Sequence, residues 1–264
     1  MSIRTAVAAT LLLAFVSGTV LAADAPAPAL KKGDRIVFLG DSITAGAVRP
    51  DGFVTLIKAA LDTNAKDLGV ETVGAGISGN KVPNLQARLE KDVLDKKPTI
   101  VFIYIGINDV WHWKKQADGT MAGGTPKDKY EAGLKEIIGK IKAAGARVIL
   151  CTPSTIGEKN DGSNERDAML EEYSTISRGV AKDCGVELLD LRKAFIDYEK
   201  ANNKDNQPKG ILTGDGVHLN KQGNVFVSEQ MLKVLGVAPA PAAAAAPAAE
   251  KAPEKAEKAT KKKK

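Results

Sequence analysis

A serine near the beginning of the chain and an aspartate–histidine pair near its end could together perform nucleophilic chemistry. Ser42 follows Gly40 and Asp41, and Asp215 precedes His218 by three residues in the segment Asp-Gly-Val-His. A histidine that removes the proton of a serine hydroxyl, with a carboxylate that fixes the imidazole tautomer, is what acyl transfer requires. We therefore predict Ser42 as nucleophile, His218 as base and Asp215 as the residue that orients the base.

Acyl transfer also needs hydrogen-bond donors for the developing oxyanion, and the sequence offers three. They are the backbone N–H of Ser42, the backbone N–H of Gly79 in the glycine-rich segment 74–80, and the side-chain amide of Asn108. Each residue alone also has an ordinary structural explanation, since serine caps helices and asparagine occupies turns. The functional interpretation therefore depends on a fold that gathers all of them at one place.

The residues around Ser42 predict the elements that position it. Residues 35–39 are mostly apolar and β-branched or aromatic, and the run stops at Gly40, which is typical of a strand buried on both faces. Residues 52–61 carry apolar side chains at helical spacing. Ser42 would then lie between the carboxyl end of a buried strand and a helix, where open α/β sheets place their chemistry.

The same alternation of strand and helix continues along the chain. We expect strands near 35–40, 69–73, 99–106, 146–152 and 186–191, and helices near 52–61, 83–94, 130–144, 165–183, 192–201 and after Asn220. Strands that alternate with helices predict an α/β fold, a three-layer α/β/α sandwich with a parallel sheet. Right-handed crossovers place every strand-to-helix loop at one sheet edge, so the candidate site residues should meet there.

Four short segments resemble the sequence blocks of the SGNH hydrolases, also called GDSL lipase/acylhydrolases. They are Gly40-Asp41-Ser42-Ile43, Gly79, Gly106-Ile107-Asn108-Asp109 and Asp215-Gly216-Val217-His218, in the order that the family shows. The resemblance covers residues 33–236 and implies a flavodoxin-like five-stranded sheet of order 2-1-3-4-5. It further implies the triad and oxyanion-hole roles given above, and no metal or organic cofactor. The segment 111–125 is less typical of the family.

Several residues beside these segments have either a structural or a substrate-binding interpretation. Asp41 and Asp109 are expected to shape turns, although Asp41 could also line the substrate site. Trp111 and Trp113 are either core aromatics or a platform for a sugar or acyl chain, since aromatic side chains serve both uses. His112 is expected to be a surface or packing residue.

The two ends of the chain differ in composition from the part between them. Residues 1–23 combine Arg4, an apolar core and small residues, which predicts a signal peptide and a secreted or periplasmic location. A Pro/Ala spacer covers residues 24–32, the hydrolase domain residues 33–237, and an Ala/Pro/Lys-rich tail, expected to be disordered, residues 238–264.

Charge is concentrated in that tail, which has seven lysines and three glutamates in a chain of net charge +6. The domain itself is nearly neutral, which argues against a nucleic-acid-binding protein. The tail is either a solvated spacer or a weak attachment to an anionic surface. Nothing in the sequence indicates a particular oligomeric state.

The two cysteines are expected to remain unpaired. Cys151 ends a predicted strand and Cys184 ends the following helix, so the two lie at opposite ends of a parallel sheet. A disulfide requires Cα atoms within about 7 Å. We expect two free, buried thiols, and with only two cysteines and two histidines in the chain we do not expect a structural zinc site.

Three classes of function are compatible with these residues. The first is a secreted serine esterase that acts on a small-molecule or polysaccharide acyl ester. The polar loops favour short acyl groups; the alternative within this class is a lysophospholipase- or thioesterase-like lipid acylhydrolase. The second is a metal-dependent phosphoesterase with Asp41, Asn108, Asp109 and His218 as ligands, a set poor in histidine and carboxylate. The third is a non-catalytic binding protein. Hydrolysis and acyl transfer to a sugar would use the same site.

Overall fold

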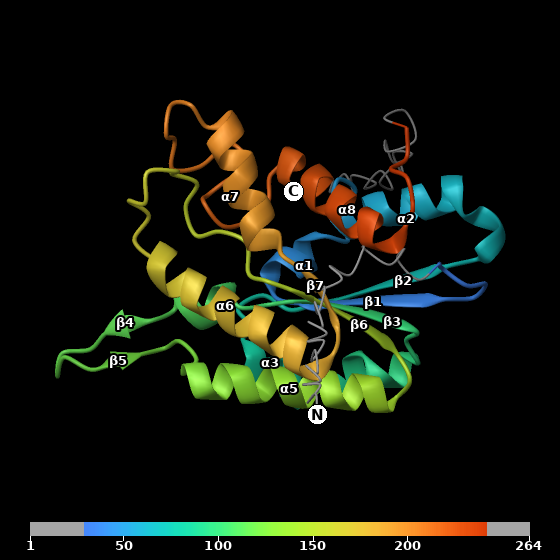
Figure 1. The fold of residues 1–264 in the computed structure, drawn as a ribbon, viewed down its shortest axis with the longest axis horizontal. Helices are drawn as coiled ribbons and strands as arrows, with labels where there is room; N and C mark the ends of the chain where they lie inside the picture. The colour runs from blue at the N-terminus through green and yellow to red at the C-terminus, as the bar shows by residue number, and fades with distance from the viewer. Residues whose placement is uncertain (1–28, 242–264) are drawn as a thin grey trace, which may run out of the picture.

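Five parallel strands form the centre of the protein in a computed structural model that describes residues 29–241 (Figure 1). The strand order is β2-β1-β3-β6-β7, with β1 Arg35–Gly40, β2 Glu71–Gly76, β3 Ile100–Tyr104, β6 Arg147–Cys151 and β7 Glu187–Leu189. Counted along the chain, these five strands have the expected order 2-1-3-4-5. Strands β4 Lys114–Lys115 and β5 Met121–Ala122 form a separate pair outside this sheet.

The centre of the sheet is apolar on both faces because β1 and β3 consist largely of aliphatic and aromatic residues. All five residues of β3 are buried. Its Phe102 pairs in register with Phe38 of β1, and the two rings stack at 5.3 Å between centroids. Phe53, the first residue of α2 Phe53–Asn64, meets Phe38 edge-on, with 6.1 Å between the ring centroids. This continuous burial explains why the sequence shows apolar runs here rather than alternation.

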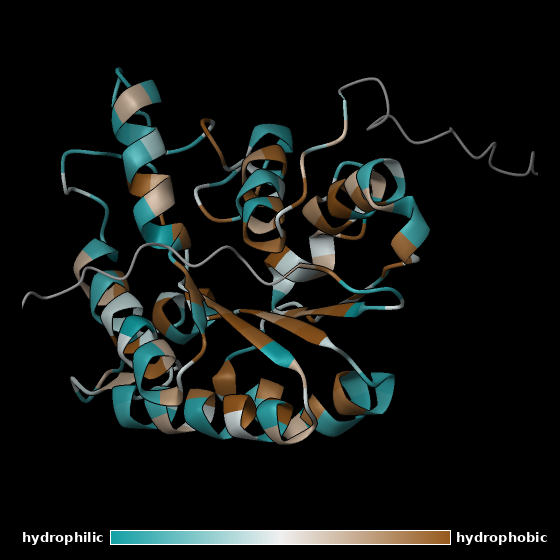
Figure 2. Ribbon diagram, turned by 45° about the vertical axis from the view of Figure 1, so that its right-hand side comes forward, coloured by the Kyte–Doolittle hydropathy of each residue, from teal (hydrophilic) through white to brown (hydrophobic). Residues whose placement is uncertain are grey.

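Helices cover both faces of the sheet, as Figure 1 shows: α3, α5 and α6 lie on one side and α2, α7 and α8 on the other. Figure 2 shows that the helices carry polar residues on their outer surfaces, while the strands between them are predominantly hydrophobic. The helices are α1 Ser42–Gly46, α2 Phe53–Asn64, η1 Lys66–Leu68, α3 Val82–Asp92, η2 Leu94–Lys96, α4 Ile107–Trp111, α5 Lys127–Ala143, α6 Asp167–Cys184, α7 Leu191–Asn202 and α8 Lys221–Leu235. The predicted three-layer sandwich is thus confirmed.

Part of the glycine-rich segment belongs to a strand, contrary to expectation. Strand β2 continues through Gly76, which pairs with Gly40, and the turn begins only at Ile77. A Cβ on Gly76 would lie 2.1 Å from the backbone nitrogen of Ala45. Glycine is therefore needed here so that α1 can pack directly on the strand.

The segment after α4 contains a hairpin that apolar periodicity does not reveal. Strands β4 Lys114–Lys115 and β5 Met121–Ala122 pair antiparallel and are exposed. Two-residue strands with two lysines give no alternating pattern, so the sequence predicted only a loop.

Both cysteines are free, as expected, but only one is fully buried. Cys151 lies at the end of β6 with no exposed surface, and Cys184 at the end of α6 is partly exposed. Burial raises the pKa of the Cys151 thiol above its usual range.

The predicted signal peptide, most of the spacer and most of the Lys-rich tail lie outside the described residues. Within residues 29–241, no helix has the length and apolar character needed to cross a membrane.

Candidate active site

Ser42 lies at the carboxyl end of β1, as the sequence predicted, but as the first residue of a short helix rather than as its cap. The cap is Asp41, whose Oδ1 accepts a hydrogen bond of 2.9 Å from the N–H of Ile43. A Cβ on Gly40 would lie 2.2 Å from Thr44 Oγ1 and 2.5 Å from the carbonyl oxygen of Tyr104. Gly40 therefore allows α1 to start immediately at the strand end.

The structure brings Ser42, His218 and Asp215 into one hydrogen-bonded chain. Ser42 Oγ lies 2.9 Å from His218 Nε2, although the two residues are 176 positions apart. His218 Nδ1 lies 2.7 Å from Asp215 Oδ2, and Asp215 Oδ1 accepts the N–H of His218 at 2.7 Å. The side chain of His218 is 43% exposed, so a substrate can reach it.

Electrostatics keep Asp215 charged beside the histidine. Partial burial acts to raise the pKa of Asp215, but hydrogen bonds from the His218 ring and from the N–H groups of His218 and Val217 outweigh it and lower this pKa below its usual value. The carboxylate can thus hold the Nδ1 proton of His218 and stabilise an imidazolium.

The three predicted oxyanion donors belong to adjoining segments. The N–H groups of Ser42 and Gly79 have no acceptor among residues 29–241. Gly79 has φ +78, which a glycine adopts without strain. Asn108 is 3% exposed, and its amide donates to the carbonyl of Asn80 at 3.1 Å, which ties it to the Gly79 turn. Only one of the two amide protons of Asn108 is used in this bond, so the other can be donated to a ligand.

Arg88 of α3 joins the nucleophile strand to the Gly79 turn, and sequence reasoning missed it. Its guanidinium donates to the carbonyl oxygens of Gly40 at 2.8 Å and Ala75 at 3.0 Å, and to Asn80 Oδ1 at 2.7 Å. The side chain is 12% exposed. The available signal was an arginine adjacent to Leu89 on the apolar side of the predicted helix.

Asp41 and Asp109 are buried and shape turns, as expected. Burial, opposed by the weaker effect of hydrogen bonds, raises the pKa of Asp41 to about 7 and that of Asp109 to about 6. Asp109 Oδ1 accepts the N–H of Val82 at 3.1 Å. Asp41 is only 1% exposed, so the expectation that it lines the substrate site is corrected: its carboxylate is used beneath the surface to cap α1.

The two tryptophans have different environments. Trp111 is 40% exposed, and its ring meets that of His218 in a T-shaped contact at 6.2 Å. Trp113 instead donates its indole N–H to Tyr173 at 3.3 Å, and its carbonyl accepts a bond of 3.0 Å from Arg166. The structure thus places Trp111 next to the candidate base and gives Trp113 a packing role. Partial burial, with nearby lysines, lowers the pKa of His112.

A cleft of about 530 Å³ opens beside Ser42 and His218. Most of its other lining residues come from the segment between α1 and α2 and from the start of α8: Arg49, Pro50, Asp51, Gly52, Asn220, Lys221 and Asn224. The remaining ones are Ile43 and Gly46 of α1, Ser78 of the turn after β2, and Leu219. Charged and amide side chains therefore form much of its wall, and no periodic pattern in the sequence indicated them. In residues 29–241, no group of three or more His, Cys, Asp or Glu side chains is arranged to hold a metal ion.

This fold and this site define the class of the protein, the SGNH hydrolases. Residues 38–225 match the GDSL-like Lipase/Acylhydrolase family, and the chain belongs to this family. It is therefore a carboxylic ester hydrolase.

Related proteins and solved structures agree with this assignment. An acetylxylan esterase of Geobacillus stearothermophilus is 31% identical over 223 residues, which cover 77% of this chain and 94% of the relative. The isoamyl acetate-hydrolyzing esterase 1 homolog of Rattus norvegicus is 28% identical and covers 73% of this chain and 78% of its own. The structure of the acetyl xylan esterase AlAXEase is 45% identical and has a TM-score of 0.71. The match covers 76% of this chain and 99% of that one. The structure of a catalytic mutant of the Geobacillus stearothermophilus enzyme, in which a serine is replaced by alanine, is 28% identical and has a TM-score of 0.67. The match covers 78% of this chain and 96% of that one.

Proposed function

We propose that the protein is an exported serine esterase that removes acetyl groups from a carbohydrate through an acyl-serine intermediate. The observation that carries the mechanism is the chain of hydrogen bonds from Ser42 Oγ to His218 Nε2, at 2.9 Å, and from His218 Nδ1 to Asp215 Oδ2, at 2.7 Å. Such a chain lets the imidazole accept the serine proton as the acyl bond forms.

In the first half-reaction, Ser42 Oγ bonds to the acyl carbon and His218 Nε2 accepts the hydroxyl proton. The N–H groups of Ser42 and Gly79 and the amide of Asn108 stabilise the oxyanion. The bond between the acyl carbon and the alcohol oxygen then breaks, and His218 donates its proton to the departing alcohol. In the second half-reaction, a water molecule gives a proton to His218 Nε2 as its oxygen bonds to the acyl carbon. The bond between the acyl carbon and Ser42 Oγ then breaks, His218 returns the proton to Ser42 Oγ, and the acid leaves.

Three observations favour short acyl groups on a sugar. The cleft beside Ser42 is walled by Arg49, Asp51 and amide side chains, which suit a hydroxyl-rich alcohol better than a long acyl chain. Trp111 offers an exposed ring beside His218, as carbohydrate sites commonly do. Relatives named as acetylxylan esterases and isoamyl acetate-hydrolyzing esterases act on acetyl esters.

Export is proposed from residues 1–23 alone, whose charged, apolar and small-residue regions follow the order of a signal peptide. Expression in a bacterial host with amino-terminal sequencing of the extracytoplasmic protein tests it. A mature start near residue 23 supports the proposal, and a full-length protein retained in the cytoplasm contradicts it.

The substrate proposal is tested with p-nitrophenyl esters of increasing acyl length beside acetylated xylo-oligosaccharides. We expect kcat/KM to fall steeply beyond short acyl chains and acetate to be released from the oligosaccharides. A maximum at long chains would instead indicate a lipid acylhydrolase. Loss of activity with a chelator, restored by a divalent metal, would indicate a metal-dependent phosphoesterase when phosphoesters are also cleaved.

The mechanism is tested by comparing the two histidines of the chain. We expect His218→Ala to lower kcat by several orders of magnitude, as removal of a triad base does. His112→Asn serves as the matched control and should retain activity within a few-fold. Equal losses in both variants would argue against His218 as the base.

A further inference from the structure

A buried glutamate outside the proposed triad holds the segment that carries two of its members. Glu158, in the loop after β6, has no exposed surface. Its Oε1 accepts the backbone N–H groups of Leu212 at 2.7 Å and Thr213 at 2.6 Å, and its Oε2 accepts that of Ile211 at 2.7 Å. Three consecutive amides thus point at one carboxylate, and only Gly214 separates them from Asp215.

These three amides lie in the base of the turn that presents Asp215 and His218. Thr213 and Leu219 pair as an antiparallel bridge, and the N–H of Gly214 donates to the carbonyl of His218 at 2.8 Å. Contacts that hold residues 211–213 in position therefore also determine the position of His218 relative to Ser42.

The Glu158 loop makes two further contacts with the same segment through its backbone. The N–H of Gly157 donates to the carbonyl of Gly216 at 2.7 Å, and the N–H of Glu158 donates to that of Pro208 at 3.0 Å. The amide of Asn203 also donates to the carbonyl of Glu158, at 2.7 Å. The carboxylate is thus one of several contacts between residues 157–158 and residues 208–216, and we call this set of contacts the joint between the two loops.

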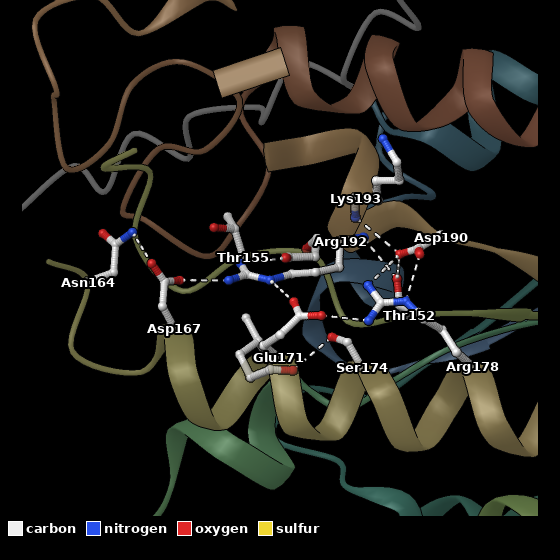
Figure 3. A network of polar contacts seen from close by, with 12 residues as sticks. Thr152, Thr155, Asn164, Asp167, Glu171, Ser174, Arg178, Asp190, Arg192 and Lys193 are labelled. Atoms are coloured by element: carbon white, nitrogen blue, oxygen red, sulfur yellow. Dashed lines mark hydrogen bonds and ion pairs between the residues drawn. The ribbon is translucent and has the colours of Figure 1, made fainter. Parts of the chain in front are cut away.

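The beginning of the Glu158 loop is itself anchored to the rigid layers of the fold through a network that includes Asp167, Arg178 and Arg192, which Figure 3 shows. Arg192, 4% exposed, donates to the carbonyl of Ser154 at 3.2 Å and to Asp167 at 2.9 Å. Arg178 connects Glu171 at 2.6 Å with Asp190 at 2.7 Å. The network joins α6 and α7 to the end of β6, so Glu158 extends from a fixed base.

The charge on Glu158 is balanced by backbone dipoles rather than by a cation, because no ion pair involves this residue within residues 29–241. Hydrogen bonds to a charged acceptor are stronger than neutral ones, and a buried N–H that loses its acceptor is costly. Replacing the carboxylate by an amide would direct an –NH₂ group at one of the three N–H donors. The joint would then open or shift.

We propose that Glu158 is a positioning residue that sets the distance between His218 and Ser42. Asp215 and His218 are bonded to each other within their own turn, so they would move as one unit when the joint loosens. The contact that changes is then the 2.9 Å separation of His218 Nε2 and Ser42 Oγ. This inference rests on the proposed serine mechanism, because it assigns His218 the role of base.

The test compares Glu158→Gln with the wild-type chain and with Glu199→Gln as matched control. Glu199 is also buried, at 3% exposed, but its carboxylate accepts no bond from residues 211–213. Active sites are counted by complete reaction with a fluorophosphonate, and kcat is expressed per counted site. We expect Glu158→Gln to lower this kcat by about 10- to 100-fold, as small misplacements of catalytic groups do, with KM changed less than about threefold and Glu199→Gln near wild type.

A second variant covers the case in which Glu158→Gln does not fold. Glu158→Asp keeps the charge but withdraws it by one methylene, and we expect an intermediate loss of kcat per counted site with folding retained. The rate of fluorophosphonate reaction should fall in parallel, since it also depends on His218. The inference would be overturned if the variant that folds had fewer counted active sites than the wild-type chain but the wild-type kcat at each of them. Such a result would show that Glu158 has a purely structural role.

The outcome also separates this inference from the proposed function. If the wild-type enzyme hydrolyses esters but does not react at Ser42, the serine mechanism fails. If it reacts at Ser42 and the Glu158 variants react equally fast, only the positioning role fails.

Discussion

At the level of single residues, Ser42 and His218 depend on charged side chains that touch neither of them. Arg88 binds the carbonyl that ends β1 and the turn that carries Gly79, and Glu158 binds the amides that precede Asp215. Each uses a full charge to hold backbone atoms, which gives stronger bonds than neutral groups provide. The nucleophile side and the base side of the site are thus positioned separately.

The contribution of Arg88 can be measured with Arg88→Met, which removes the guanidinium but keeps much of the apolar stem. Two partly buried carbonyls and Asn80 lose their donor, so we expect a destabilisation of about 2–4 kcal/mol and a kcat lowered about 10-fold or more. Chemical denaturation and ester hydrolysis report the two effects.

The control for this change is Arg35→Met at the opposite end of β1, whose guanidinium pairs with the exposed Glu71. It should leave kcat unchanged, because exposed ion pairs contribute little and this one is remote from Ser42. An Arg88 variant with wild-type kcat would show that the Gly79 turn keeps its position unaided.

At the level of helices and strands, the contact between β2 and α1 places the first turn of the Ser42 helix. Gly76→Ala would put a methyl group 2.1 Å from the Ala45 nitrogen and 2.4 Å from the Thr44 carbonyl carbon. We expect a loss of about 1–3 kcal/mol from overpacking and lower activity as α1 is displaced. Thermal unfolding and kcat are the measurements.

The same substitution should have the opposite effect in the middle of a helix. Gly139 lies within α5, and a methyl group added there would have no neighbouring atom within 4 Å. Gly139→Ala is expected to stabilise the protein by up to about 1 kcal/mol with kcat unchanged. Equal effects of the two substitutions would contradict the close approach at Gly76.

The segment with α4 and the β4–β5 hairpin sets the substrate preference if Trp111 contacts the sugar. We expect Trp111→Ala to raise KM for acetylated xylo-oligosaccharides by about 3- to 10-fold, the value of one aromatic contact. KM for p-nitrophenyl acetate, which has no sugar, should change little. A parallel change for both substrates would indicate that Trp111 acts only by packing against His218.

For the molecule as a whole, buried acids make stability depend on pH. Burial, and then the charge of Glu158, raises the pKa of Glu199 from its ordinary value of 4.5 to about 8. The folded state therefore holds a proton that the unfolded state releases, so unfolding becomes easier as pH rises from about 4.5 to about 8. Stability from this group is present below the lower value and lost across that range.

Glu199→Gln should remove this part of the pH dependence. Urea denaturation at pH 5 and pH 8 is expected to show a smaller difference in unfolding free energy for the variant than for the wild-type chain. An identical difference in both proteins would mean that Glu199 is ionised at neutral pH in the folded state.

The architecture and the reacting residues could be predicted from the sequence because their signals are local. Apolar runs such as 100–104 identify buried strands, and Ser42 and His218 have chemically distinctive side chains beside such elements. Arg88 offers only a weak signal, an arginine on the apolar side of a predicted helix, and its bond to Gly40 lies 48 positions away. Glu158 offers none, because the N–H groups that it accepts lie more than 50 positions along the chain. The close approach of Gly76 to α1 is likewise a tertiary contact that no periodicity records.

Whether Ser42 carries the acyl group is decided most directly by trapping the intermediate. The enzyme is mixed with p-nitrophenyl acetate, quenched in acid within the first turnovers, digested and analysed by mass spectrometry, with Ser42→Ala treated in parallel. We expect an acetyl group on the peptide that contains Ser42 and none on that peptide of the variant. Rapid turnover with no acetylated Ser42, or a Ser42→Ala enzyme that retains wild-type kcat, would refute the serine mechanism.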